Sequence, residues 1–435
     1  MSEVVIPSVA RVQRVPVRWR IFAFLFAFGF LAYLQAKTIT VAAERMMPEL
    51  GLSHDAIAYL EQAFVWGYAL CQMPGGILGQ RLGARRTLVL ISLLAFLAAI
   101  AMPIAPFVFH GKALYAALYG AQLLLGCSQG ALFPVSAGVF EAWFPARRWS
   151  LVQGLQTMAL GLGAAAAPYL ITRLTAWVGW QWAIIWSSLP ALALIAAWAH
   201  YGRDTPREHP DVTPQEIDLI GSQPKTDSSI NLRQLLGLLR DRNVVLLFIS
   251  YMSMNYTFYM LSNWVFLYLV EERHFSALDS GMLAMAPPLA AALGAGIGGY
   301  LTGVAVARLG NAWGYRLLPL IAMPGAGLLL LIVIHSGNAY VALAALTACF
   351  GAVELTEGAF WGGGMNVGQA DTMAVTGFMN TGGNLGGIIA LPIVGHLAGL
   401  HDWNTAFLIG IGFAAVSALS WLAIRVSEPE RHAGR

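Results

Sequence analysis

Long apolar runs, separated by short polar segments, dominate the hydrophobic pattern of this chain. A bilayer core about 30 Å thick is crossed by a helix of about 20 apolar residues. By this criterion the first half contains six predicted spans: Ile21–Ala42, Ile57–Leu78, Thr87–Phe107, Ala113–Phe140, Ser150–Thr172 and Trp182–His200. The second half contains six more: Val244–Val270, Ser280–Val304, Arg316–His335, Tyr340–Met365, Thr372–Ala398 and Thr405–Val426. The pattern predicts an all-α membrane protein with twelve transmembrane helices in two six-helix bundles.

The long polar stretch in the middle of the chain predicts the domain organisation. Residues 201–242 form a linker between bundles at 21–200 and 243–426, with tails at 1–20 and 427–435. If the chain reverses at each span, the linker lies on the same side as the basic positions Arg81, Arg85, Arg86, Arg147 and Arg148. Basic residues favour the cytoplasmic side. We therefore expect linker and termini to be cytoplasmic, in an inner or plasma membrane.

Composition excludes several other classes of protein. With 58% hydrophobic and 11% charged residues over 435 positions, the chain is too apolar for a soluble domain. Its net charge of +3 is small and scattered, which argues against nucleic-acid binding. The cysteines Cys71, Cys127 and Cys349 lie in apolar runs, where a thiol packs as a small hydrophobe. We find no metal-binding cluster, no nucleophile motif with a partner and no ATP-binding loop, and therefore expect neither an enzyme nor a pump, and no cofactor or metal.

Glycine-rich stretches recur within the predicted spans, at 161–168, 294–299 and 382–387. Small residues let helix backbones approach closely in lipid, where no hydrophobic force holds helices together. Two interpretations remain open for each stretch: a surface along which helices slide, or an ordinary packing seam.

Lys37 is an ionisable residue inside the first span, one helical turn after Tyr33 and on the same face. A charge at the bilayer midplane costs about 3 kcal/mol or more, so a retained one is usually functional. We expect Lys37 to attract an anion, with Tyr33 beside it. The alternative is a lysine near the outer end of the span that extends to the lipid headgroups.

Glu354, Glu357 and Trp361 in the tenth span are spaced by three and four residues, which places them on one helical face. Two carboxylates this close in a low dielectric do not both ionise easily, so we expect one to exchange a proton during transport. A structural ion pair is the alternative. Glu61, in the first turns of the second span, is a weaker proton-carrying candidate that could simply face water.

Neutral polar side chains also recur at helical spacing. Tyr251, Asn255, Tyr259 and Asn263 follow one another at intervals of four, which predicts a polar stripe facing a solute cavity. Hydrogen bonding between helices is the alternative. Gln122 and Gln129 are two turns apart on one face of the fourth span, and we expect them to line the same cavity. Gln153 and Gln156 are weaker candidates.

The loop after the second span resembles the G-x-x-x-D-R-x-G-R-R loop of the major facilitator superfamily, through Gly76, Gln80, Arg81, Gly83 and Arg85. A weaker copy, from Gly299 through Arg308 to Gly310, occupies the matching loop of the second half. The resemblance implies two halves that rock about a central site and a loop that controls the conformational switch. Because Gln80 replaces the acidic residue of the motif, the charge link that steadies one conformer is expected to be weakened.

Within that superfamily, the chain resembles the anion:cation symporters, such as the sialin, hexuronate, galactonate and phthalate permeases. The resemblance is carried by the stretches at 66–76, 130–134, 143–148 and 377–387. It implies that Tyr68, Asn380 and Asn384 line the substrate cavity. The acidic and basic residues of the family's first and fourth spans are absent, because those spans carry Gln35, Ala36, Gln122 and Gln129. Lys37 aligns with a lysine of the organophosphate permeases, which favours an anionic substrate.

These observations predict a secondary active transporter of a small organic anion, a carboxylate or sugar acid, driven by protons and acting as a monomer. One alternative is a carrier or uniporter of a neutral or zwitterionic solute, because amides have replaced charged residues. Another is a membrane sensor that binds a solute without moving it.

Overall fold

The computed structural model describes residues 15–221, 232–274 and 286–426, and every regular element in these ranges is helical. The first half contains α1 (Val17–Leu50), α2 (His54–Leu82), α3 (Ala84–Val108), α4 (Gly111–Gly130), α5 (Leu132–Trp143), α6 (Trp149–Val178) and α7 (Trp180–Tyr201). Short helices α8 (Pro214–Ile220) and α9 (Leu232–Leu238) belong to the linker. The second half contains α10 (Arg242–Glu271), α12 (Ala286–His335), α13 (Ala339–Glu354), α14 (Glu357–Gly368), α15 (Thr372–Gly399) and α16 (Trp403–Ala423).

These helices correspond to the twelve predicted spans. The fourth span consists of α4 and α5, and the tenth of α13 and α14. The eighth and ninth spans both lie in α12, where Gly310 adopts a φ of 76° that breaks the helix. A positive φ is strained for residues other than glycine, so Gly310 allows the tight turn between the two spans. The predicted start of the eighth span, at Ser280, lies outside the described residues.

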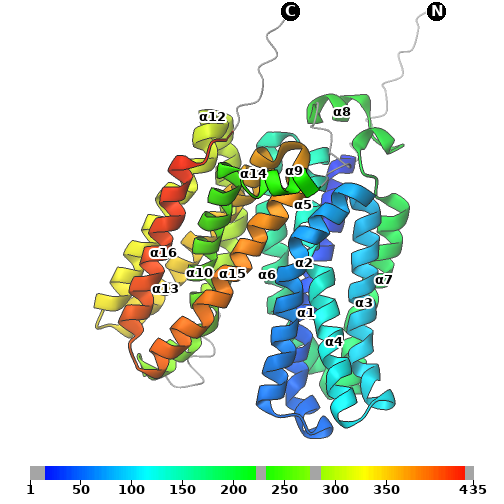
Figure 1. The fold of residues 1–435 in the computed structure, drawn as a ribbon, viewed down its shortest axis with the longest axis vertical. Coiled ribbons are helices and arrows are strands. Elements are labelled where there is room, and N and C mark those ends of the chain that lie inside the picture. Colours follow the sequence, from blue (N-terminus) through cyan, green and yellow to red (C-terminus); the bar gives the residue numbers. More distant parts are fainter. Residues whose placement is uncertain (1–14, 222–231, 275–285, 427–435) are drawn as a thin grey trace, which may run out of the picture.

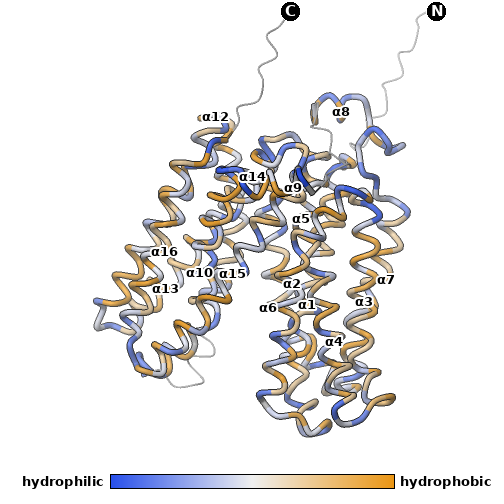
Figure 2. Tube along the Cα trace, viewed as in Figure 1, coloured by the Kyte–Doolittle hydropathy of each residue, from blue (hydrophilic) through white to orange (hydrophobic). Residues whose placement is uncertain are grey.

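The helices form two bundles, α1–α7 and α10–α16, which meet at one end of the molecule and diverge towards the other (Figure 1). Apolar residues predominate along both bundles, and polar residues gather near the ends of the helices (Figure 2). We call the end where α1 begins and α16 finishes the closed end, and the opposite end the splayed end.

Glycines allow the halves to approach closely at the closed end. A Cβ added to Gly76 in α2 would overlap the carbonyl oxygen of Met373 in α15. Gly154 in α6 packs in the same way against the backbone of Ala295 and Gly299 in α12. Glycines at 382–387 instead pack α15 against α10 within one half. The Gly299 contact is therefore an interface between halves, whereas the 382–387 stretch is a packing seam.

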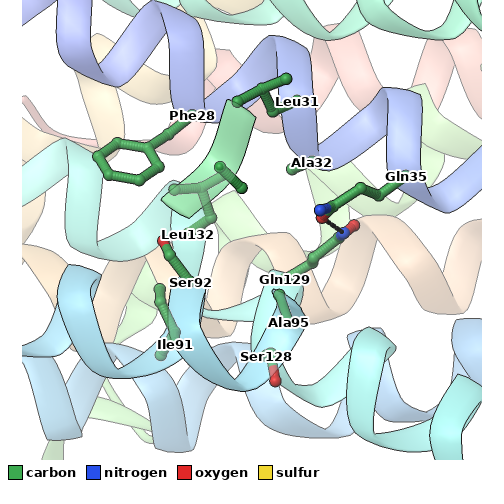
Figure 3. Close-up of a pocket in the computed structure, with 11 residues that line it drawn as sticks. Phe28, Leu31, Ala32, Gln35, Ile91, Ser92, Ala95, Ser128, Gln129 and Leu132 are labelled. Atoms are coloured by element: carbon green, nitrogen blue, oxygen red, sulfur yellow. Dashed lines mark hydrogen bonds between the residues drawn. The ribbon is translucent and has the colours of Figure 1, made fainter. Parts of the chain in front are cut away.

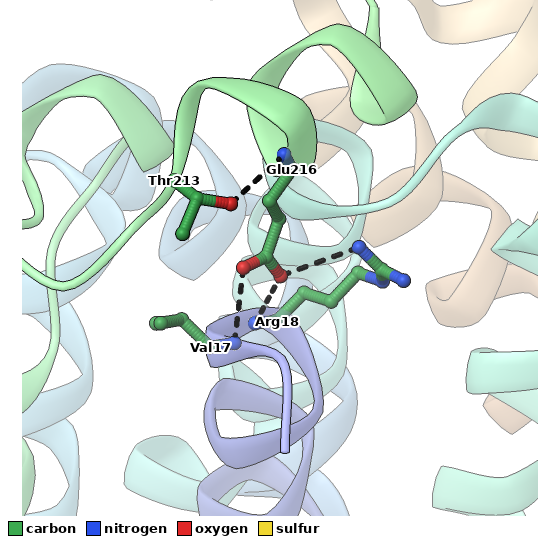
Figure 4. Close-up of polar contacts among 4 residues, drawn as sticks. All are labelled: Val17, Arg18, Thr213 and Glu216. Carbon is green, nitrogen blue, oxygen red and sulfur yellow. Dashed lines mark hydrogen bonds and ion pairs between the residues drawn. The ribbon is translucent and has the colours of Figure 1, made fainter. Parts of the chain in front are cut away.

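The first part of the linker is docked on the amino-terminal half. Glu216 in α8 accepts hydrogen bonds from the backbone N–H groups of Val17 and Arg18, at 3.2 and 3.0 Å (Figure 4). It also forms a 3.3 Å ion pair with the Arg18 guanidinium. Carboxylates suit this position because the free N–H groups of a helix start carry partial positive charge. Asp204 binds the Arg85 backbone N–H at 2.7 Å, further along the same surface.

Candidate substrate and proton site

A buried carboxylate, Glu357, lies at the centre of the carboxyl-terminal half. Its Oε1 accepts a 2.9 Å hydrogen bond from the Tyr251 hydroxyl of α10, and its Oε2 a 2.8 Å bond from the indole N–H of Trp361. Glu357 opens α14, and Trp361 follows one turn later on the same face. The two partners hold both oxygens of the carboxylate in a fixed orientation, as the sequence spacing of four predicts for Trp361.

Glu354 lies beside Glu357, although the two do not belong to one continuous helix. The tenth span is interrupted at Leu355 and Thr356, so Glu354 ends α13 and Glu357 starts α14. Both intervening residues keep right-handed helical φ and ψ angles, so the interruption does not reverse the course of the chain. Both carboxylates are nevertheless buried, with 5% and 4% of their surfaces exposed, and the two charges interact. Among the described residues, neither carboxylate has an ion-pair partner within 4 Å.

Tyrosines from both halves converge on this carboxylate. Tyr33 in α1 and Tyr68 in α2 are neighbours, and Tyr68 lies beside the side chain of Asn380 in α15. Glu357 lies within electrostatic range of both hydroxyls and of Tyr259 in α10. The structure thus brings together residues that the sequence analysis selected separately from five spans.

The predicted polar stripe of α10 contacts both its own helix and α15. The Tyr259 hydroxyl donates to Asn384 Oδ1 at 3.3 Å, and Asn384 Nδ2 donates to the Asn380 carbonyl at 3.0 Å. Asn255 and Asn263 each donate to the backbone carbonyl four residues earlier. Part of the stripe therefore serves packing between and within helices, as the alternative interpretation predicted.

Lys37 and Glu61 lie on the same side of the amino-terminal half as the paired tyrosines, nearer the splayed end. Lys37 follows Tyr33 by one turn, about 6 Å along α1, and is exposed. Thr40 continues this face and donates a 2.7 Å hydrogen bond to Glu61, which precedes Tyr68 by two turns of α2. The face that carries Lys37 therefore lies next to α2, and the lysine side chain itself is exposed. Glu61 is partly exposed and bound to Thr40 rather than to the buried carboxylates.

The predicted glutamines occupy a different place. Gln129 Nε2 lies 3.4 Å from Gln35 Oε1, beside a cavity of about 30 Å³ lined only by residues of the amino-terminal half (Figure 3). A space of this size admits a water molecule or two, not a sugar acid. Gln122 is buried two turns earlier, and neither of its polar side-chain atoms has a hydrogen-bond partner among the described residues. Among the described residues, neither Gln122 nor Gln129 is hydrogen-bonded to the tyrosines or to Glu357. Of the weaker candidates, Gln156 donates to Ser136 at 2.8 Å.

The switch loop connects the halves through Gln80. Its Nε2 donates to Asp371 Oδ1 at 3.1 Å and to the Ala370 carbonyl at 3.3 Å, while its Oε1 accepts the Ala374 backbone N–H at 3.0 Å. Ala374 belongs to the first turn of α15, whose free N–H groups need acceptors. A carboxylate could not donate to Asp371, whereas the amide both donates and accepts. The glutamine therefore does not remove the link between the halves; it replaces a charge contact with hydrogen bonds.

The other loop residues hold the amino-terminal half and the linker together. Gly83 has a φ of 85°, and a side chain there would also clash with Asp204. Arg85 donates to the Ala199 carbonyl at the end of α7 and, through its backbone, to Asp204. Arg81, which follows Gln80, is exposed.

One buried carboxylate escaped the sequence analysis. Glu141 in α5 is 3% exposed and is bonded to the Thr372 hydroxyl of α15 at 2.8 Å. Its position next to the predicted end of the fourth span made it resemble an interfacial residue. The sequence pattern that could have revealed it is a carboxylate inside the apolar run Val139–Phe144.

Twelve spans in two bundles, joined at one end by a polar link and carrying a buried polar centre between them, define a polytopic membrane transporter. The chain belongs to the Major Facilitator Superfamily: the model of that family matches residues 25–370. It is thus a transporter rather than an enzyme, as predicted.

Relatives and solved structures agree with this assignment. A probable sulfoacetate transporter of Cupriavidus necator is 26% identical, over 97% of this chain and 98% of the relative. A probable galactarate/D-glucarate transporter of Escherichia coli is 25% identical, over 95% and 94%. The E. coli fucose:proton symporter FucP, in its outward conformation, has the same fold, with a TM-score of 0.70 over 94% of this chain and 100% of that one, at 17% identity. These relatives bear out the resemblance to anion:cation symporters.

Proposed function

We propose that this chain is a secondary active symporter that moves a small organic anion, a carboxylate or sugar acid, together with a proton. The observation that supports the proposal is the buried pair Glu354 and Glu357, in which both oxygens of Glu357 are held by Tyr251 and Trp361. Transport would follow the alternating-access scheme in which the halves rock about this centre. We place the protein in the inner or plasma membrane, as a monomer, with the closed end facing the cytoplasm.

The proton assignment follows from hydrogen-bond chemistry. Burying two carboxylates as ions without a basic partner costs several kcal/mol, so at least one carries a proton. Glu357 accepts a hydrogen bond at each oxygen, from Tyr251 and Trp361, an arrangement that suits an ionised carboxylate. Glu354 then holds the proton in this conformation. During the cycle the pair would pass the proton from one side of the membrane to the other.

The anion assignment rests on Lys37 and on the relatives. Lys37 is exposed on the face of α1 that carries Tyr33, so an anion reaching the tyrosine centre from the splayed end passes its ammonium group. Tyr68, Asn380 and Asn384 would then orient hydroxyl or carboxylate groups of the solute. Both named relatives are described as carriers of organic acids.

Uptake into proteoliposomes tests this proposal. The panel would contain sulfoacetate, glucarate, an aromatic carboxylate, a sugar phosphate and a neutral sugar, each with and without an inward proton gradient. We expect gradient-stimulated uptake of at least one carboxylate or sulfonate. Lys37→Ala and Lys37→Gln should then raise its KM about ten- to a hundredfold, because a hydrogen bond to a charged group contributes about 1.5–3 kcal/mol.

Lys112→Ala is the matched control, because Lys112 is an exposed lysine at the start of α4, outside the polar centre. It should leave KM unchanged. Equal anion uptake by the wild type and both Lys37 variants would show that Lys37 does not attract the anion.

A second candidate, the carrier of a neutral or zwitterionic solute, is favoured by one observation. Most polar groups around Tyr68 are amides and hydroxyls, which bind neutral solutes as well as anions. Uptake of a neutral sugar that ignores the proton gradient would support this candidate and contradict the first.

A further inference from the structure

Glu141 and Thr372 form a buried contact between the halves that the transport site does not use. Glu141 lies near the end of α5 in the amino-terminal half, and Thr372 begins α15 in the carboxyl-terminal half. Glu141 Oε1 and Thr372 Oγ1 are 2.8 Å apart, and the two residues are 3% and 1% exposed. The contact therefore exists only while the closed end is shut, because separating α5 from α15 would admit water.

The surroundings of the Thr372 hydroxyl indicate which group holds the proton. Besides Glu141, its Oγ1 lies 2.8 Å from the Gln369 carbonyl and 3.1 Å from the Met365 carbonyl. A hydroxyl has one hydrogen to donate but can also accept. If Glu141 is protonated, its O–H donates to Thr372 Oγ1, and the threonine hydrogen remains for a carbonyl. If Glu141 is ionised, the threonine must turn its hydrogen to the carboxylate and away from the two carbonyls.

In the part of the chain that the structure describes, Glu141 has no ion-pair partner. Charged groups on the elements packed against α5 are Arg18 and Arg20 of α1, Arg81 of α2, Arg85 and Arg86 of α3, Arg147 and Arg148 before α6, Glu357 of α14 and Asp371 before α15. Within the described ranges, none of these forms an ion pair or hydrogen bond with Glu141. A buried carboxylate that lacks a cation is much less costly as the neutral acid.

We propose that Glu141 is a proton-binding site that closes the transporter: its carboxylic acid bonds Thr372 across the halves, and loss of that proton releases the closed end. Glu141 takes up one proton from the solution on the closed side when α5 and α15 meet, and it returns that proton to the same solution when they part. This site is separate from the proposed Glu354 and Glu357 pair. It makes opening easier when that solution is alkaline.

The test measures opening directly and needs no substrate. Spin labels at Arg86→Cys and Arg308→Cys, two exposed closed-end positions in opposite halves, report the distance between the halves in lipid nanodiscs. The background replaces Cys71, Cys127 and Cys349. In the protein that retains Glu141, we expect the ratio of closed to open molecules to fall as the pH rises. The fall should be up to about tenfold per pH unit, because one proton is linked to closure.

The Glu141→Gln variant distinguishes a proton-binding site from a residue that only packs, because the amide donates to Thr372 as the acid does but cannot ionise. In this variant the ratio of closed to open molecules should stay at its low-pH value throughout the series. Thr372→Val should lower the closed fraction even at low pH. Glu216→Gln is the matched control: this closed-end carboxylate is paired with Arg18 inside one half, so the pH response should survive.

A wild-type ratio that does not depend on pH would overturn the proposal, as would a Glu141→Gln variant that responds to pH like the wild type. Neither result depends on the substrate. Failure of anion uptake with a normal opening response would overturn only the symport proposal.

Discussion

The two halves of the molecule differ in the carboxylates that they bury away from the closed end. The carboxyl-terminal half buries Glu354 and Glu357, and both oxygens of Glu357 have donors in Tyr251 and Trp361. The amino-terminal half buries neutral amides such as Gln122, several of whose atoms have no partner among the described residues. Among the described residues, the buried carboxylates of the centre thus lie in one half, while the other half contributes tyrosines and an exposed lysine.

This difference bears on how a proton could drive rocking. A carboxylate pair in one half senses the other half through groups near enough to feel its charge, and Tyr33 and Tyr68 lie within electrostatic range of Glu357. A proton on the pair changes the charge that these hydroxyls face. The amides cannot respond to a proton, so they can only shape and pack the half in which they lie.

The largest effect that follows from this comparison concerns Glu357. Glu357→Gln should abolish gradient-driven accumulation of the anion, because the amide cannot ionise. Exchange of labelled for unlabelled solute, which needs no net proton movement, should continue at a comparable rate. Glu61→Gln, which alters a partly exposed carboxylate bound to Thr40, should still accumulate solute. Loss of accumulation in Glu61→Gln alone would move the proton site into the amino-terminal half.

A smaller effect is expected from the unpaired amides. Gln122→Leu should raise the free energy of unfolding by about 1 kcal/mol and leave uptake intact, because it removes buried polar atoms that lack partners. Gln156→Leu should lower stability by about 1–3 kcal/mol, because Ser136 loses its partner. Thermal unfolding in detergent compares the two variants. A Gln122→Leu protein that folds but does not take up solute would show that Gln122 takes part in substrate binding.

The comparison also shows what the sequence could predict. The number of spans followed from apolar length, and the Glu357–Trp361 contact followed from helical spacing, because both depend on local order. The partners of Gln80 lie about 290 positions away, so no local pattern could reveal that its amide bonds Asp371 and Ala374. Gln122 and Gln129 share a helical face as predicted. Which neighbour that face meets depends on how the helices pack, and the partner of Gln129 is Gln35 of α1.

The smallest predicted effect concerns the linker, which is docked on the amino-terminal half by neutral contacts as well as ionic ones. His209 packs against the rings of Tyr201 and Trp143, with centroids 4.5 and 5.9 Å away, and burial lowers the pKa of its imidazole. The released linker therefore binds a proton more readily than the docked one. Docking should be complete above the ordinary histidine pKa of about 6.5 and weaken as pH falls below it.

Hydrogen exchange over residues 206–220, corrected for the intrinsic effect of pH, measures this docking. Exchange should speed up between neutral and mildly acidic solution in the wild type. In His209→Phe, whose ring keeps the packing but cannot be protonated, it should not. His200→Phe changes an exposed histidine at the end of α7 and should retain the wild-type response. A response that persists in His209→Phe would mean that acid acts through the ionic contacts of Glu216 and Asp204, and that the neutral cluster contributes only packing.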